Sequence, residues 1–144
     1  MSRAIALLAL LAPLACGPLV MIPGGALSGE VAPPPGDWTF TDDIDTVQLE
    51  TNPEDPYSVN VWGVAAGDGF YIAAGDKDSQ WARNVRANPF VRLRVDGVLY
   101  ELAAKEVMDD AQRELFLVAV KKKYDFEPDP EQRESSSLFE LAPR

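Results

Sequence analysis

Apolar and polar residues alternate over 90–95 and again over 98–107, which predicts two neighbouring β-strands. Asp96 and Gly97 separate the two runs, and Asp-Gly is typical of a two-residue type I′ hairpin turn. With this loop, one face of the hairpin is wholly apolar, and Arg92 faces Glu101 on the other face. The pattern therefore predicts a fixed register, which pairs Val95 with Val98, Leu93 with Tyr100 and Val91 with Leu102.

A second strand pair is predicted upstream of this hairpin. Residues 58–65 alternate, and residues 70–74 form an apolar run typical of a strand that is buried on both faces. The connection over 66–69 supplies glycines that tolerate positive φ. The segment 46–50 also alternates, with Val47 and Leu49 inward, and we interpret it as the first strand of the sheet, followed by a loop over 51–56.

Two helices are predicted. Ser79 is a suitable N-cap for a short helix that ends at Asn88, because the residue before Pro89 avoids the α region. Asp109 or Asp110 caps a second helix that extends to about Tyr124 and ends in a lysine run, although the apolar stretch 115–120 would also suit a strand. The lysine run is interpreted as a solvated helix end, with phosphate or anionic lipid as the alternative ligand. A loop over 127–131 and a last strand over 137–141 complete the chain.

The order of these motifs resembles one protein superfamily. It runs from the Gly75 turn through Trp81-x-x-Asn84, Ala87-Asn88-Pro89 and Val91-x-Leu93-x-Val95 to the closing stretch Leu138–Arg144. This order is similar to that of the pyridoxamine 5′-phosphate oxidase-like split β-barrel flavoproteins and the related deazaflavin-dependent nitroreductases. The resemblance implies a mainly β fold of the α+β class, FMN-binding-like, with about six antiparallel strands and two helices. It also implies an oxidoreductase, with FMN or a deazaflavin as cofactor at the interface of a homodimer.

The resemblance also suggests where a cofactor would bind, since the equivalent turn and helix border the flavin in that superfamily. Backbone amides at the helix start, with Lys77, Arg83 and Arg86 near Ser79, would suit an anion. A flat ring would be lined by Asn60, Trp62 and Trp81, with Tyr57 as a further candidate. The alternative interpretation places Trp81 in the core and the arginines on an ordinary surface helix.

One segment departs from that superfamily. The connection after the first strand, which is glycine-rich and basic in the deazaflavin-dependent relatives, is acidic here, with Glu50, Glu54 and Asp55. Like charges repel a phosphate. A second hypothesis is therefore a split-barrel binding or scaffold protein without a cofactor, and a third is binding of another planar ligand such as haem.

The N-terminus predicts export. Arg3, an apolar run over 5–11 and Ala15 before Cys16 resemble a lipoprotein-type signal peptide over 1–15, cleaved at Ala15 and lipidated on Cys16. Residues 16–36, rich in proline and glycine, then form a linker to a barrel domain over 37–144. This organisation predicts a lipoprotein tethered to the membrane of a bacterial envelope. The alternatives are a transmembrane anchor over 4–23, interrupted by prolines, and a signal in which Cys16 carries no lipid.

Composition excludes several classes of function. The chain has no histidine and a single cysteine, which excludes His-containing zinc sites and Ser-His-Asp or Cys-His machinery. No acidic cluster has the spacing of a calcium loop, so no metal site is predicted. The formal net charge of −10 argues against binding to nucleic acid, which requires a basic surface.

Overall fold

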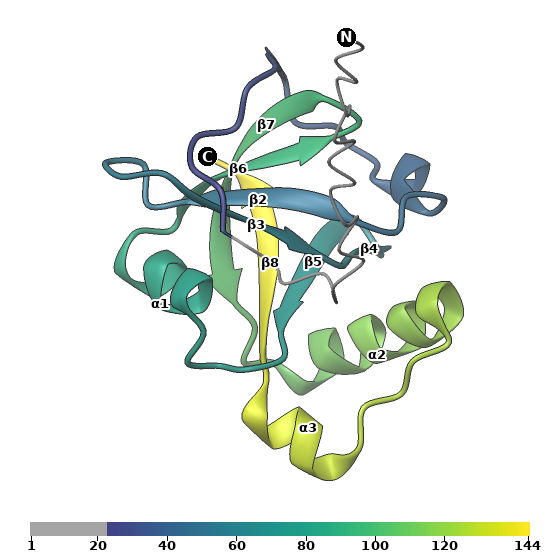
Figure 1. The fold of residues 1–144 in the computed structure, drawn as a ribbon. Coiled ribbons are helices and arrows are strands. Elements are labelled where there is room, and N and C mark those ends of the chain that lie inside the picture. The colour runs from purple at the N-terminus through teal and green to yellow at the C-terminus, as the bar shows by residue number, and fades with distance from the viewer. Residues whose placement is uncertain (1–22) are drawn as a thin grey trace, which may run out of the picture.

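The computed structural model describes residues 23–144, and its central feature is one curled sheet (Figure 1). Strands β6 (Phe90–Val95) and β7 (Val98–Glu106) form the predicted hairpin, and all the predicted pairs, including Arg92 with Glu101, are present. Both turn residues have positive φ, 48° at Asp96 and 79° at Gly97, as a type I′ turn requires. The predicted register is therefore confirmed.

The sheet order is β3-β2-β6-β7-β8-β5-β4, with β1 added in parallel beside β7. Its two edge strands are consecutive in the sequence, since β3 ends at Val61 and β4 begins at Gly63. The sheet therefore curls until its two edges meet at Trp62, the single residue between β3 and β4. The remaining strands are β1 (Glu30–Ala32), β2 (Val47–Thr51), β3 (Tyr57–Val61), β4 (Gly63–Ala66), β5 (Gly69–Ala74) and β8 (Ser137–Pro143).

Helices cover the two edges. Helix α1 (Gln80–Ala87) begins after Ser79, ends at Asn88 as predicted, and contacts β2 and β3. Helix α2 (Asp110–Tyr124) contacts β4, and the Asp109 side chain caps it by accepting the Gln112 N–H. A one-turn 3-10 helix, η1, spans Thr39–Thr41.

A third helix, α3 (Pro130–Ser135), begins within the last two residues of the predicted loop and continues beyond it. Asp129 and Gln132 form a reciprocal capping box, and Pro130 occupies the first helical position. Proline is well tolerated there, because the N–H that it lacks has no helical partner in any case. The predicted loop over 127–131 is therefore confirmed only as far as Asp129, and the count of two helices is wrong, because Pro130 starts a helix.

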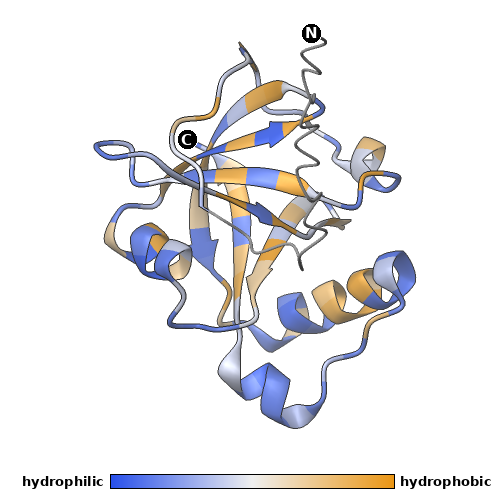
Figure 2. Cartoon of the chain, in the orientation of Figure 1, coloured by the Kyte–Doolittle hydropathy of each residue, from blue (hydrophilic) through white to orange (hydrophobic). Residues whose placement is uncertain are grey.

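The interior of the barrel is apolar, and α2 encloses a second cluster against the outside of the sheet (Figure 2). Strand β5 contributes to both: Phe70 and Ile72 point into the barrel, and Tyr71 packs under α2 with Phe116. Val47 and Leu49 are buried in the barrel as predicted. The prediction that the segment 70–74 is buried on both faces is confirmed.

The described part of the predicted linker packs against the barrel. Glu30–Ala32 pairs with 98–100 of β7, and Gly24 exchanges backbone hydrogen bonds with Ser58 at 2.9 and 2.8 Å. The folded unit thus reaches upstream of Asp37, where the sequence places its start. The predicted signal peptide over 1–15 and the lipidation of Cys16 lie outside the described residues. No helix between residues 23 and 144 is long and apolar enough to cross a membrane.

A substitution at Gly63 tests how tightly the sheet closes. A Cβ atom there would collide with the Phe70 ring and would lie 3.2 Å from a Val47 methyl. We expect Gly63→Ala to lower the free energy of unfolding by about 1–3 kcal/mol, since a packed core resists added volume. Chemical denaturation measures this change. Gly75→Ala is the matched control, because a Cβ there meets nothing within 4 Å, and a loss of similar size in both variants would contradict the proposed closure.

Candidate functional site

The break between β3 and β4 turns the Trp62 side chain out of the sheet and onto α2. Its ring stacks on Tyr124 with a centroid separation of 4.3 Å and an interplanar angle of 5°. The Phe126 ring meets Trp62 edge-on at 5.8 Å. Trp62 nevertheless remains 51% exposed, so a flat apolar surface stays accessible at this corner.

Polar contacts fix the C-terminal end of α2 beneath this stack. Lys123 Nζ donates to the carbonyls of Thr41 at 2.9 Å and Gly63 at 2.7 Å. The Tyr124 hydroxyl donates to the Asp45 carbonyl at 2.7 Å and accepts the Gly63 N–H at 3.3 Å. Lys123 therefore does not belong to a purely solvated helix end, as the sequence suggests for the lysine run; it ties α2 to the break in the strand.

Burial shifts the pKa values of both anchoring groups. Desolvation lowers the pKa of Lys123 and raises the pKa of Tyr124, because each charged form loses water. Asp45 acts on both groups: its charge raises the pKa of Lys123 and of Tyr124. The corner of the barrel is thus a partly desolvated region with acidic groups nearby.

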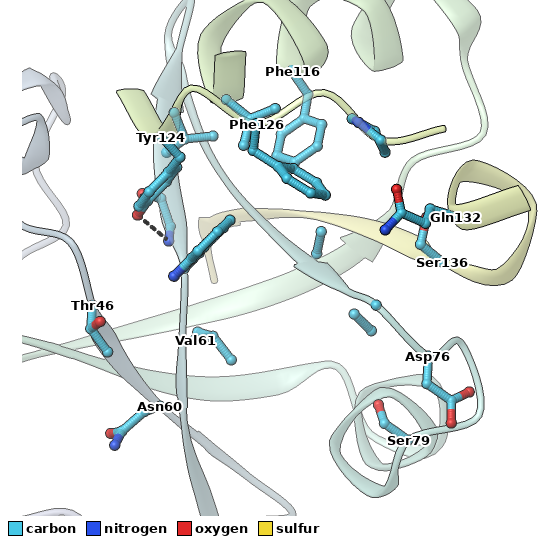
Figure 3. Close-up of a pocket in the computed structure, with 18 of the residues that line it drawn as sticks. Thr46, Asn60, Val61, Asp76, Ser79, Phe116, Tyr124, Phe126, Gln132 and Ser136 are labelled. Atoms are coloured by element: carbon cyan, nitrogen blue, oxygen red, sulfur yellow. Dashed lines mark hydrogen bonds between the residues drawn. The ribbon is translucent and has the colours of Figure 1, made fainter. Parts of the chain in front are cut away.

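Beside the aromatic stack lies a cavity of about 510 Å³ (Figure 3). The strand break, the end of β5, the start of α1 and the segment after α2 each contribute to its wall. Tyr124, Phe126 and Phe116 gather at one end, while Asp76, Ser79, Gln132 and Ser136 lie toward the other (Figure 3). The full lining is Thr46, Asn60, Val61, Trp62, Gly63, Val64, Ala73, Ala74, Gly75, Asp76, Ser79, Trp81, Phe116, Val120, Tyr124, Phe126, Pro128, Gln132 and Ser136.

Ser79 contributes an unsatisfied polar atom to this lining. It precedes α1 with the extended backbone of an N-cap, but its side chain makes no capping hydrogen bond. The hydroxyl oxygen is buried and has no hydrogen-bond partner among the described residues. Buried polar atoms are usually paired, so this hydroxyl is a candidate donor or acceptor for a ligand.

The structure brings together four of the residues that the sequence proposes for a cofactor site. Asn60, Trp62, Ser79 and Trp81 all line the cavity. Trp81 is also a core residue, 8% exposed and packed on Phe139, so both interpretations of it hold in part. Tyr57 packs against the core cluster and is not among the lining residues.

The three basic residues of the predicted site lie outside the cavity lining. Arg86 forms an ion pair with Glu106 at 3.1 Å and donates to the Ser137 hydroxyl at 2.7 Å and to the Lys77 carbonyl. The hydrogen bond with Glu106 raises the pKa of Arg86 and lowers that of Glu106, which marks a structural pair. Arg83 is exposed on α1 and donates to Gln80 at 3.0 Å.

The acidic connection after the first strand also lies away from the cavity. Glu50 belongs to β2, is 4% exposed, and accepts the Leu27 N–H at 2.6 Å while lying 3.5 Å from Arg92. Together with Pro53 and Pro56 it lines a separate hollow. Its charge is thus partnered within the fold, and the predicted repulsion by this loop does not act from the cavity wall.

Several lining residues carry no motif that points to them in the sequence. Phe116 reaches the cavity because α2 packs on β4, and Gln132 and Ser136 reach it from α3 and the residue after that helix. Tyr124 and Phe126 have a weak signal, two aromatic residues at the end of the predicted helix and just after it. Residues 23–144 contain no cluster of histidine, cysteine and acidic side chains that could hold a metal ion. The arrangement is suited to a planar, largely apolar ligand that contacts aromatic faces and a few polar atoms.

A sequence comparison finds a family match that overlaps this region. The model of the F420H(2)-dependent quinone reductases matches residues 54–134, which include most of the cavity lining. No curated protein matches the sequence.

Solved structures with the same fold support the sheet topology. A pyridoxamine 5′-phosphate oxidase, described as putative, from Listeria innocua is 16% identical, with a TM-score of 0.57 over 74% of this chain and 89% of that one. An F420-H2 dependent reductase is 20% identical, with a TM-score of 0.55 over 68% and 94%. A chain described as a domain-swapped dimer is 20% identical, with a TM-score of 0.54 over 68% and 80%. These likenesses confirm the predicted split β-barrel.

The anchoring role of the Tyr124 hydroxyl can be separated from the stacking of its ring. Tyr124→Phe keeps the ring but loses the hydrogen bonds to Asp45 and Gly63, so we expect a loss of about 1 kcal/mol in the free energy of unfolding. Because the folded state raises the pKa of Tyr124, its stabilising contribution is present below the ordinary value of 10.0 and is lost as the pH rises through the folded pKa. Denaturation curves at neutral and alkaline pH measure both effects. Tyr100→Phe is the control, and equal losses in the two variants would count against the anchor.

Proposed function

The chain belongs to the F420H(2)-dependent quinone reductase family, and from this premise we propose that it is an oxidoreductase that holds the ring of a deazaflavin in the cavity beside Trp62. The observation that supports the proposal most directly is the aromatic wall of Trp62, Tyr124 and Phe126 around a cavity of about 510 Å³. Ligand pockets of this kind are mostly apolar and carry few polar groups.

The residues present fit the ring part of such a cofactor. The accessible face of Trp62 would stack on a tricyclic ring, and Phe116 and Trp81 supply further apolar contacts. The unpaired Ser79 hydroxyl and the exposed amide of Asn60 could bond to polar atoms at the edge of the ring. These side chains come from β3, the break after it, the start of α1 and α2, so the fold itself defines the orientation of the ring.

A bound deazaflavin supplies hydride for the reduction of an oxidised acceptor, such as the quinone in the family's description. The residues of this chain would bind and orient the two partners and exclude water from the apolar end. The Tyr124 hydroxyl already bonds to backbone groups, and Asp76 accepts the Asp78 N–H at 2.8 Å. The protein's contribution is therefore proposed to be positioning, with the cofactor carrying the chemistry.

FMN has the same tricyclic shape, but the family match favours a deazaflavin over FMN. The second candidate function is a barrel without a cofactor that serves as a binding or scaffold protein. It is favoured by the absence of lysine and arginine from the cavity lining between residues 23 and 144. A direct binding measurement distinguishes the two candidates.

We expect the full chain to bind a deazaflavin saturably in an absorption titration with F420, 5-deazariboflavin, FMN and haem, each added separately. Trp62→Ala should weaken the binding about tenfold, because stacking on an aromatic side chain contributes about 1–3 kcal/mol per ring. Phe40→Ala is the control, since Phe40 is an exposed aromatic residue outside the cavity. Circular dichroism confirms that both variants fold. Failure of both deazaflavins to bind would reject the cofactor-binding proposal and leave the scaffold function.

We also propose that the protein is exported and tethered to a bacterial membrane through Cys16, and that it is a homodimer. The N-terminal pattern of Arg3, the apolar run and Ala15-Cys16 supports the first proposal. The likeness to a domain-swapped dimer supports the second. The structure adds exposed apolar side chains on α2, Leu115 at 43% and Val118 at 68%, which a second copy could cover.

One preparation tests both proposals. The full chain expressed in a bacterium should appear in the membrane fraction and incorporate labelled fatty acid, and Cys16→Ser should abolish the labelling. Sedimentation of the detergent-extracted protein should give twice the mass of one chain. Labelling that persists in Cys16→Ser would exclude this cysteine as the site of lipidation, and a single-chain mass would exclude the dimer.

A further inference from the structure

The charges around the cavity differ from what an anionic cofactor requires. Among residues 23–144, the lining contains one charged side chain, Asp76, and no lysine or arginine. A phosphate group placed in such a site would lose water without gaining a cation in exchange. The cavity therefore fits the ring of the family's cofactor and does not fit its anionic tail.

The nearest basic groups around α1 do not compensate. Arg86 is neutralised by Glu106, to which it donates two hydrogen bonds at 3.2 and 3.1 Å. Lys77 lies between Asp76 and Asp78 in the sequence, so this turn carries a net negative charge. Arg83, the remaining basic residue of α1, is exposed, bonds to Gln80 and lies outside the cavity lining. The polar end of the cavity consequently presents one charged lining group, the Asp76 carboxylate, beside the unpaired Ser79 hydroxyl.

The aromatic end adds no lysine or arginine to the cavity lining among the described residues. Lys123, at the end of α2, is bound to the carbonyls of Thr41 and Gly63. Asp42 and Asp45 are close enough to act on its pKa, and both raise it. The Lys123 ammonium is therefore engaged within the fold and is not free to bind a phosphate.

From these charges we propose that the cavity takes the uncharged part of a deazaflavin, its ring and sugar-alcohol chain, and that a phosphate on the ligand weakens binding instead of strengthening it. This inference rests on the proposed function, because it concerns the same cavity. The Ser79 hydroxyl and the Asn60 amide are neutral groups that suit hydroxyl groups on such a chain. Asp76, at the polar end, is the residue that a phosphate would meet.

The test uses 5-deazariboflavin and its 5′-phosphate, which share one ring and differ in a single phosphate. We expect the full chain to bind the neutral compound about fivefold more tightly at low ionic strength, and the difference to shrink as salt screens the charges. Fluorescence titration gives the two dissociation constants directly, with no turnover required.

Asp76→Asn should bring the dissociation constants of the neutral compound and its phosphate closer together. The substitution removes the negative charge, while the amide oxygen can still accept the Asp78 N–H. Asp68→Asn is the matched control: it makes the same change of net charge in the exposed turn between β4 and β5, outside the cavity. The control should leave the preference for the neutral compound almost unchanged.

The outcomes separate the two proposals. Equal or tighter binding of the phosphate would overturn the inference and leave the proposed function standing. The inference would also be overturned if Asp76→Asn and Asp68→Asn reduced the preference for the neutral compound equally. The preference would then come from the net charge of the protein and not from the cavity. If neither compound binds, the proposed function fails and the inference fails with it.

Discussion

The curled sheet depends on one steric constraint, the close approach of Phe70 to the backbone at Gly63. Phe70 is fully buried in the barrel, and Gly63 leaves no room for a side chain between them. This contact allows the chain to leave one edge of the sheet at Val61 and enter the other edge directly. The same one-residue break expels the Trp62 side chain, so the geometry that closes the sheet also builds the wall of the cavity.

Local chemistry predicts a large share of this fold. Asp96-Gly97 selects its own turn type, and the apolar alternation on either side then permits one register. The end of α1 and the start of α2 follow from Pro89 and Asp109 for the same reason, since each acts on the backbone within a few residues. These predictions succeed because the interactions that decide them lie within the window that a sequence pattern covers.

The errors arise where distant partners decide the role of a residue. Arg86 is typical of an exposed helix residue in the sequence, yet Glu106 and Ser137, brought by β7 and β8, bind its guanidinium. The same holds for Glu50, because its partners, Arg92 and the Leu27 backbone N–H, are distant in the sequence. The capping box of α3 is local, since Asp129 and Gln132 are three residues apart, but the sequence pattern predicts a loop there and no helix. Four of the seven predicted site residues thus line the cavity, and the three basic ones lie outside its lining.

The fold of this chain and the charge around its cavity are decided by different residues, so the chain can share the fold of its family and differ in the ligand charge that it accepts. Barrel topology is set by apolar packing and turn residues, which tolerate almost any charge on the surface. Ligand choice, by contrast, depends on a few side chains at the ends of elements, and here they are neutral or acidic. On the proposal made above, a cavity with aromatic walls and no basic lining holds a planar ring and does not attract a phosphate. Family membership therefore constrains the shape of the ligand more strongly than its charge, and the charge has to be decided from this chain's own residues.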